Sequence, residues 1–251
     1  MSFPAVPPIR RDPFPHAVAE DFLDADLYRS LRDSFPECPP NSGPTGYSLF
    51  KDDAAYAALL EAQPAWRQLF DWTQSQAFVD YMLGAFRDDL AREARVDLSN
   101  ARFVAHVEDR VEKEARHLAP TGLAPDALFV RTDILQGNAG YDRRPHVDHR
   151  RRAATMLIYC CDGDEAAMDG GDLVLHDAAG APVETIRPRH NRMVMFPCVN
   201  ASVHSVSPIR AQASPRNFIQ ITVSSSADLW DPLPEAPRPG LLARALRRIR
   251  R

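Results

Sequence analysis

The segment PHVDH, residues 145–149, holds side chains well suited to bind a metal ion. Successive side chains of a β-strand point to opposite faces, so on a strand His146 and Asp148 would project together while Val147 points away. An imidazole nitrogen and a carboxylate oxygen would then be neighbouring ligands. A histidine from another strand would complete a triangle that leaves three coordination positions open, an arrangement suited to iron(II) and oxygen chemistry.

The triplet is a weak signal when it is taken alone. A chain with this many histidines and aspartates contains on the order of one His-x-Asp by chance, and the alternative is an exposed strand end with a solvated carboxylate. A similar triplet, His106-Val107-Glu108, lies earlier in the chain, but no series of strand signals follows it in matching order. We therefore interpret it as an exposed strand end.

The segments around His146 resemble those of a known enzyme family in order and spacing. A Gly140-Tyr141 turn comes before the histidine, and after it follow RRAATMLIYCCD, GGDLVLHD, RMVMFP, ASVHSVSP and RNFIQITV. From about Leu135 to Val223 the chain is similar to the prolyl-4-hydroxylase-like branch of the iron(II)/2-oxoglutarate-dependent oxygenases. The resemblance implies bound Fe(II), with 2-oxoglutarate and O2 as co-substrates and ascorbate as a useful addition to an assay.

The resemblance also assigns roles to three further side chains. His204 in ASVHSVSP matches the distal histidine of the family and would be the third metal ligand beside His146 and Asp148. Arg216 opens the last strand where relatives place a basic residue, and its guanidinium can hold the far carboxylate of 2-oxoglutarate through two charge-assisted hydrogen bonds. Tyr159 matches a tyrosine that often shares this carboxylate. The alternatives are a core histidine, a solvated arginine and an aromatic residue that only packs.

Two positions bear on how this chain would differ from relatives. Related enzymes often have a tyrosine on the strand ahead of the first iron histidine, where this chain has Leu135, Gln136 and Gly137. Another group must take over its role, and Gln136 is a candidate. Related halogenases replace the carboxylate at the position of Asp148 with a small residue so that chloride can bind. Its presence here favours hydroxylation.

Basic residues flank the predicted metal site. Arg143 and Arg144 come just before it, and Arg152 ends a run of three arginines just after it. A run of charges is often only a solvated loop. The alternative is an electropositive collar that attracts an anionic substrate or the oxoacid, in which case Arg143, Arg144 or Arg152 would contact substrate.

The elements that must position these residues fall into two parts. Residues 1–12 predict an extended arm, and residues 13–100 predict mainly helical support, with a short strand at 14–18, a helix at 25–33, a loop over 36–50 and helices from 52 to 95. Residues 101–228 predict the catalytic core, because eight short runs rich in β-forming residues alternate there with turns. The fold class predicted is α+β: a double-stranded β-helix (jelly-roll) barrel of about eight strands with an N-terminal helical layer packed on it, in one domain over 1–251.

Two segments stand outside this scheme. The charged stretch 108–117 predicts an insertion on the rim of the barrel. Residues 229–251 predict a proline-rich tail and a basic C-terminal helix, which would either pack its apolar stripe on the body or contact an acidic partner or membrane surface.

Composition narrows the class of protein. The 251 residues carry a formal net charge of −4, which argues against general affinity for nucleic acid. The four cysteines have neither the spacing of a zinc site nor the density of a disulfide scaffold, so we expect reduced thiols. No signal peptide or membrane span is predicted, and we expect a soluble cytoplasmic protein of undetermined oligomeric state.

The function predicted is hydroxylation of an unactivated C–H bond in an amino acid, a peptidyl residue or a small biosynthetic intermediate, with release of succinate and CO2. Two alternatives stand beside it. A non-catalytic jelly-roll binding protein would not need an arginine that grips an oxoacid. A cupin-type metalloenzyme usually supplies more histidines, often as His-x-His, whereas this chain offers His-x-Asp.

Overall fold

The computed structural model describes residues 4–38, 46–51, 53–105, 123–161 and 168–232. The predicted rim insertion at 108–117 and the predicted C-terminal helix lie outside these residues. None of the described helices is long and apolar enough to cross a membrane. All four cysteines are buried and free of disulfide bonds.

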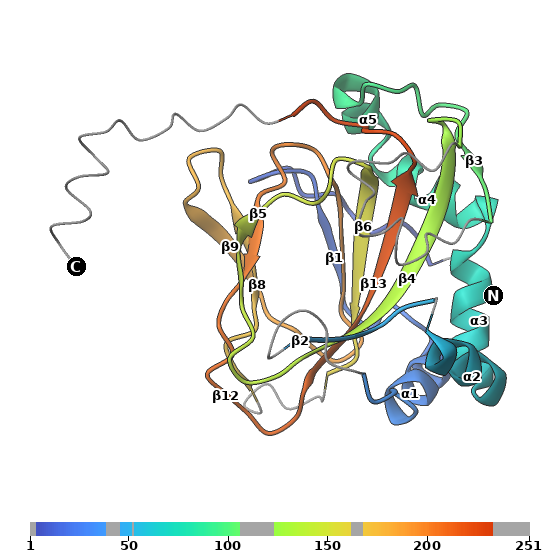
Figure 1. The fold of residues 1–251 in the computed structure, drawn as a ribbon. Helices are drawn as coiled ribbons and strands as arrows, with labels where there is room; N and C mark the ends of the chain where they lie inside the picture. The colour runs from blue at the N-terminus through green and yellow to red at the C-terminus, as the bar shows by residue number, and fades with distance from the viewer. Residues whose placement is uncertain (1–3, 39–45, 52, 106–122, 162–167, 233–251) are drawn as a thin grey trace, which may run out of the picture.

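Short helices form a layer on one side of a β-sheet (Figure 1). The first begins after Asp24, whose side chain caps it by accepting hydrogen bonds from the backbone N–H groups of Asp26 and Leu27. The helices are α1 (Ala25–Asp33), α2 (Ala54–Ala62), α3 (Pro64–Thr73), α4 (Gln76–Ala85) and α5 (Arg87–Glu93). They agree with the helices predicted at 25–33 and within 52–95.

The larger sheet has the strand order β1-β10-β6-β13-β4-β2, and β3 pairs in parallel with β4. Its strands are β1 (Ala17–Ala19), β2 (Gly46–Leu49), β3 (Arg102–Phe103), β4 (Ala127–Gly137), β6 (Arg152–Tyr159), β10 (Met193–Pro197) and β13 (Arg216–Ser225). The predicted loop over 36–50 is wrong at its end, because β2 forms an antiparallel ladder with the end of β4.

A smaller sheet of order β5-β11-β8-β9 faces the larger one across the middle of the molecule (Figure 1). Its strands are β5 (Arg143–His146), β8 (Leu173–His176), β9 (Pro182–Ile186) and β11 (His204–Val206), and a separate pair joins β7 (Met168–Asp169) to β12 (Ala211–Gln212). The fold is thus mixed α/β with two facing sheets. The described residues do not show the closed barrel that the sequence predicted.

Alternating side chains give the larger sheet two different faces. On β13, Ile219, Ile221 and Val223 belong to the core that includes the helices. Phe218 belongs instead to a second cluster that includes Tyr159 and residues of the smaller sheet. We call this second side of the larger sheet, which faces the smaller sheet, the inner face.

Asn191, between β9 and β10, ties the N-terminal segment to the larger sheet. It is 3% exposed and has a left-handed φ of 51°. Its side-chain oxygen accepts a hydrogen bond from the Leu23 backbone N–H at 3.0 Å, and its amide donates to the Leu23 carbonyl at 2.8 Å.

Replacing Asn191 with alanine should lower the free energy of unfolding by about 2–4 kcal/mol, because two buried backbone groups lose their partner and alanine tolerates a left-handed φ poorly. Urea unfolding followed by circular dichroism measures the change. Asn100→Ala, at an exposed position, is the matched control and should cost less than about 0.5 kcal/mol. Equal losses for the two variants would contradict this role of Asn191.

Candidate metal centre

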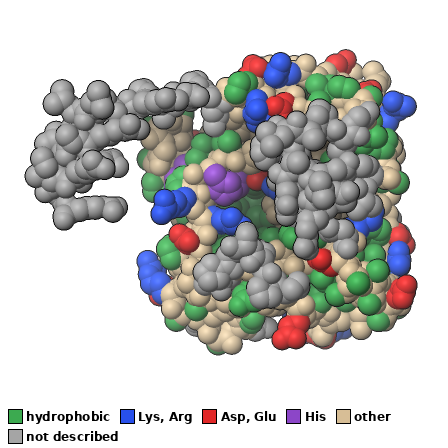
Figure 2. Space-filling model, viewed as in Figure 1, with side chains coloured by type: hydrophobic (Ala, Val, Ile, Leu, Met, Phe, Trp, Pro, Cys, Tyr) green, Lys and Arg blue, Asp and Glu red, His purple; other side chains and the backbone are tan. Residues whose placement is uncertain are grey.

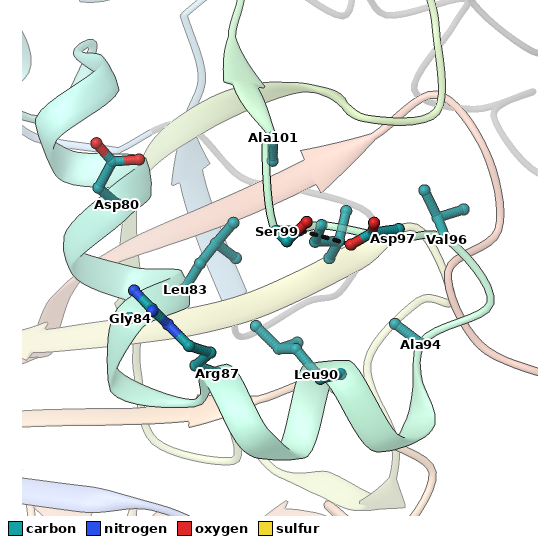
Figure 3. A pocket seen from close by; sticks show the side chains of 12 residues that line it. Asp80, Leu83, Gly84, Arg87, Leu90, Ala94, Val96, Asp97, Ser99 and Ala101 are labelled. Atoms are coloured by element: carbon teal, nitrogen blue, oxygen red, sulfur yellow. Dashed lines mark hydrogen bonds between the residues drawn. The ribbon is translucent and has the colours of Figure 1, made fainter.

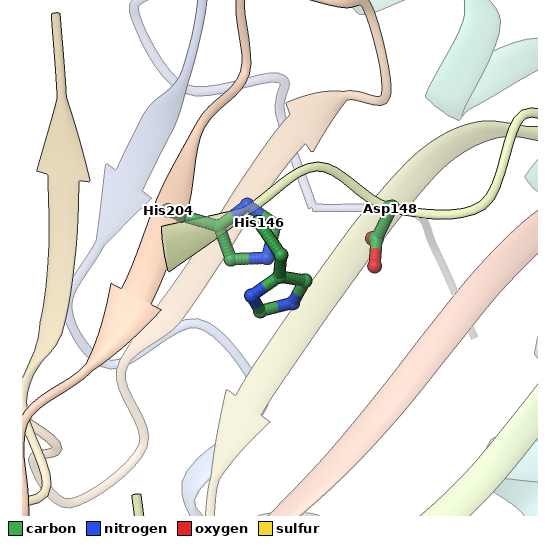
Figure 4. A group of neighbouring side chains, drawn as sticks. All are labelled: His146, Asp148 and His204. Carbon is green, nitrogen blue, oxygen red and sulfur yellow. The ribbon is translucent and has the colours of Figure 1, made fainter. Parts of the chain in front are cut away.

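Two histidines face each other across neighbouring strands of the smaller sheet. His146 ends β5, His204 begins β11, and the two are direct partners in the antiparallel ladder. Their ring centroids lie 4.4 Å apart at an interplanar angle of 52°. Figure 4 shows both imidazoles on the same side of the strands.

Asp148 completes the group from outside the strand. β5 ends at His146, so Asp148 lies in the turn that leads to β6, and the prediction that both residues share one strand is wrong. The carboxylate still points toward the histidines (Figure 4), because side chains near the start of β6 hold it. Thr155 donates to Oδ2 at 2.6 Å, and Arg152 Nη1 donates to Oδ1 at 2.7 Å.

The three side chains offer one ligand atom each, and these atoms all lie within 4.8 Å of one another. Hydrogen bonds fix which imidazole nitrogen is available. Nδ1 of His146 lies 2.8 Å from the Arg144 carbonyl, and Nδ1 of His204 lies 2.9 Å from the Ser202 carbonyl. A protonated Nδ1 that donates to a carbonyl leaves Nε2 free to bind a metal. Two imidazole nitrogens and one carboxylate fit an iron(II) ion.

Electrostatics and burial keep Asp148 ionised and His204 neutral. Burial raises the pKa of Asp148, but nearby Arg152 and His204 and the Thr155 hydroxyl outweigh this, so that its pKa is well below the usual value. Burial lowers the pKa of His204, although the neighbouring Asp148 acts in the opposite direction. An ionised carboxylate and a neutral imidazole are the forms that bind metal ions.

Two neighbours of Asp148 were not predicted from the sequence. The Thr155 hydroxyl also lies 3.3 Å from Sγ of Cys198, and that Sγ lies 3.6 Å from Asp148 Oδ2. Burial raises the pKa of Cys198 well above its ordinary value, so the thiol is neutral. A hydroxyl seven residues after a carboxylate and a thiol fifty residues after it carry no sequence signal, since only the pairing of β6 with β10 brings them together.

A second polar site lies further along the inner face. Arg216 begins β13, as predicted, and is 1% exposed. Its Nε donates to the Gly171 carbonyl at 2.7 Å, and its Nη2 donates to the Tyr159 hydroxyl at 3.2 Å. Its Nη1 is buried without a hydrogen-bond partner among the described residues. The guanidinium also lies 4.5 Å from the ring centroid of Phe218. A buried cation with an unused donor is suited to an anionic ligand.

The residues around Arg216 complete this site. Burial raises the pKa of Tyr159, although Arg216 acts in the opposite direction, so the phenol is neutral and can donate. Gly171 has a φ of +77°, and a Cβ there would lie 2.7 Å from Met168 Sδ and 3.2 Å from Arg216 Cδ. Only glycine lets the backbone carbonyl approach the guanidinium in this way.

Gln136 does not lie in this site. It pairs across the sheet with Asn217, and their amides are hydrogen-bonded at 3.0 Å on the face opposite to Arg216. The ring of Tyr141 is better placed, because it belongs to the same cluster as Tyr159 and packs so closely that a Cβ on Gly137 would lie 3.0 Å from it. The Gly140-Tyr141 turn carried this signal in the sequence, where it was read only as a turn.

The three arginines predicted to contact substrate have different surroundings. Arg143 and Arg144 are exposed on β5, and Arg143 Nε donates to the Tyr141 hydroxyl at 3.2 Å. Arg152 is directed instead toward Asp148, with side chains 14% and 7% exposed in that ion pair. Figure 2 shows a hollow on this face with histidine and basic side chains at its edge.

A separate pocket of about 580 Å³ lies in the helical layer (Figure 3). Residues of α4, α5 and the segment that follows them line it, among them Asp80, Leu83, Leu90 and Asp97. It holds none of the predicted site residues, so the chemistry of the metal centre does not take place there.

Removing one imidazole tests the metal centre directly. His204→Ala should weaken the binding of Co²⁺ to the purified protein by at least about 100-fold, because two of three ligands remain. Calorimetric titration measures this. His149→Ala, next to Asp148 but outside the three-residue group, is the control and should keep the wild-type affinity. Loss of affinity in both variants would contradict the assignment.

Residues 132–222 match the family model of the 2OG-Fe(II) oxygenase superfamily. No curated protein sequence matches.

Three solved structures are similar. A prolyl-4-hydroxylase of Pseudomonas putida has a TM-score of 0.50 at 18% identity, over 84% of this chain and 92% of that one. A prolyl 4-hydroxylase of Phytophthora capsici has a TM-score of 0.50 at 19% identity, over 84% and 58%. A 2OG-Fe(II) oxygenase family oxidoreductase of Burkholderia pseudomallei has a TM-score of 0.52 at 14% identity, over 86% of each chain.

These likenesses at low identity show the fold, and the family match covers the segment from Thr132 to Thr222 that holds all the residues of the two sites. Residues 132–222 of the chain are thus similar to the 2OG-Fe(II) oxygenase superfamily, and the fold of the chain is similar to that of prolyl-4-hydroxylases.

Proposed function

We propose that this chain is a 2-oxoglutarate-dependent dioxygenase that hydroxylates an unactivated C–H bond of an amino acid, a peptidyl residue or a small biosynthetic intermediate, with release of succinate and CO2. His146, Asp148 and His204 are the proposed ligands of Fe(II), and Arg216 with Tyr159 is the proposed site for the far carboxylate of 2-oxoglutarate. The observation that carries the proposal is that a His-Asp-His group contacts the inner face through Thr155, and that this face also carries a buried arginine with an unused donor.

Strand β6 relates the two sites to each other. Thr155 contacts Asp148 and Tyr159 contacts Arg216. Because the two β6 residues are four positions apart, they point to the same side of the sheet. An oxoacid held at its far end by Arg216 therefore extends along β6 toward the metal ligands.

Each proposed residue has a limited task. Bound iron(II) would supply the activation of O2 that no side chain can provide. The two histidines and Asp148 would hold the metal through three ligand atoms and leave coordination positions for other ligands. Tyr159 and Phe218 place aromatic surface beside Arg216, which excludes water and strengthens the ionic contact with a carboxylate. A carboxylate at position 148 would take the coordination position that a halide needs, which favours hydroxylation.

The oxidation of 2-oxoglutarate without substrate tests the proposal. Protein mixed with Fe(II), ascorbate and 2-oxoglutarate should form succinate slowly, and His146→Ala and Asp148→Ala should reduce this to background because the ion is no longer held. Liquid chromatography with mass detection measures succinate. If the wild-type chain forms none and binds no oxoacid by calorimetry, the chain is a non-catalytic binding protein.

Arg216→Ala should weaken 2-oxoglutarate binding by about 10–100-fold, since a hydrogen bond to a charged group contributes about 1.5–3 kcal/mol. The affinity for Co²⁺ should not change, because the lost contact lies at the remote carboxylate. Calorimetry measures both affinities. Arg210→Ala, which removes an exposed arginine paired with Asp169, should leave both unchanged. An equal loss of metal and oxoacid in the Arg216 variant would refute the assigned role.

A further inference from the structure

The inner face of β4 and β13 carries a third polar group. It lies next to Thr155, the residue of β6 that contacts the metal ligand Asp148. Thr222 on β13 is the direct cross-strand partner of Thr155 on one side and of Arg131 on β4 on the other. One pleat further along, Gln220 is the partner of Asp133. We call these four residues, Arg131, Asp133, Gln220 and Thr222, the inner polar patch. Figure 1 shows that β6, β13 and β4, which carry Thr155 and the patch, lie side by side.

The strand register shows that the patch faces the interior. Direct partners in an antiparallel sheet point to the same face, and Thr155 reaches Asp148 from that face. Thr132 and Ile134 on β4 point the other way, since Ile134 packs in the helical core and the Thr132 hydroxyl lies 2.8 Å from that of Thr73 on α3. The side chains of the patch and the metal ligands therefore face the same space between the two sheets.

The chemistry of the patch is unusual for a packed interior. The Thr222 side chain is fully buried, and its hydroxyl has no hydrogen-bond partner among the described residues. Arg131 and Asp133 form an ion pair at 2.7 Å with side chains only 11% and 7% exposed. A buried hydroxyl without a partner and a buried ion pair both cost free energy that apolar side chains would not. Recognition of a polar ligand explains why they are there.

One carboxylate oxygen of the patch is not used in the ion pair. Arg131 donates to Oδ2 of Asp133, which leaves Oδ1 outside that bond. Arg131 itself has a further interaction within the chain. The second carboxylate oxygen of Asp133 is suited to a cation. The Thr222 hydroxyl can donate or accept a hydrogen bond.

We propose that the inner polar patch is the substrate subsite of the proposed hydroxylase, and that the substrate carries a protonated amine held by Asp133 and a hydroxyl or carbonyl group held by Thr222. That a substrate is hydroxylated there rests on the proposed function. That the ligand carries an amine rests only on the residues of the inner polar patch.

Sheet geometry limits where that amine lies relative to the oxidised carbon. Asp133 is two strands and one pleat away from Thr155, which is on the order of 10 Å between their backbones at normal strand spacing. The amine is therefore several bonds away from the carbon that reacts, so an amine next to the oxidised carbon does not fit.

Three probes of equal length separate the chemical classes: 6-amino-1-hexanol, 1,6-hexanediol and 6-hydroxyhexanoate. Their binding to the metal-free, full-length chain is measured by saturation-transfer NMR titration, which does not depend on turnover. The amine should bind at least tenfold tighter than the diol. The acid, which can also bind at Arg216, should lose its affinity in Arg216→Ala protein, whereas the amine should not. No preference for the amine over the diol would overturn the proposal.

Two variants test whether the preference for the amine arises at the inner polar patch. Asp133→Asn should reduce the affinity for the amine to that for the diol. Thr222→Val, which removes the buried hydroxyl and adds a methyl group of similar size, should keep the melting temperature at or above that of the wild type and weaken the binding of the amine and the diol severalfold. Asp126→Asn, the same change just before β4 and on the order of 20 Å along the chain from Asp133, is the control and should keep the preference for the amine.

The outcomes separate this inference from the proposed function. Wild-type protein that forms succinate but shows no preference for the amine refutes only the subsite. Wild-type protein that prefers the amine through Asp133 but forms no succinate refutes only the oxygenase reaction. If Asp133→Asn does not fold, an unchanged affinity of the folded Thr222→Val protein for the probes refutes the subsite.

Discussion

The ladder between β5 and β11 sets the distance between the two histidines, and the geometry of the whole centre follows from it. His204 is the partner of His146 on one side and of Leu175 on β8 on the other, so its strand is held from both sides. Leu175 is fully buried. A slip of one residue would exchange the two faces of β11 and bury a polar side chain in place of Val206. The apolar contacts of the smaller sheet therefore fix the register that brings the imidazoles together.

The sequence could predict those parts of the site that depend on order along the chain. The helix at 25–33, the start of the last strand at Arg216 and the grouping of His146 with Asp148 all follow from local patterns or from a resemblance spread over six segments. The prediction that Asp148 lies on the same strand as His146 is wrong, because the strand ends earlier and Thr155 and Arg152 hold the carboxylate instead.

Contacts across the sheet could not be predicted, since no local pattern encodes them. Gln136 was chosen because it lies at the right place in the sequence, but it points to the wrong face of β4. Cys198 reaches Asp148 only through the pairing of β10 with β6. The strand β2 was missed because proline and glycine dominate the sequence before it. In each case the information lies in strand pairing over long sequence separations.

The arginines near the inner face differ in whether a carboxylate of the chain balances their charge. Arg152 is paired with Asp148 and Arg131 with Asp133, so each of these buried cations is matched by a carboxylate. Arg216 is as deeply buried and forms no ion pair among the described residues. A buried cation without a counter-ion is costly unless a ligand supplies the negative charge. The anionic oxoacid therefore belongs at Arg216, because an acid at Arg131 would have to compete with Asp133. In the proposed subsite, the same balance leaves Oδ1 of Asp133, which is outside the ion pair, to attract a positively charged substrate.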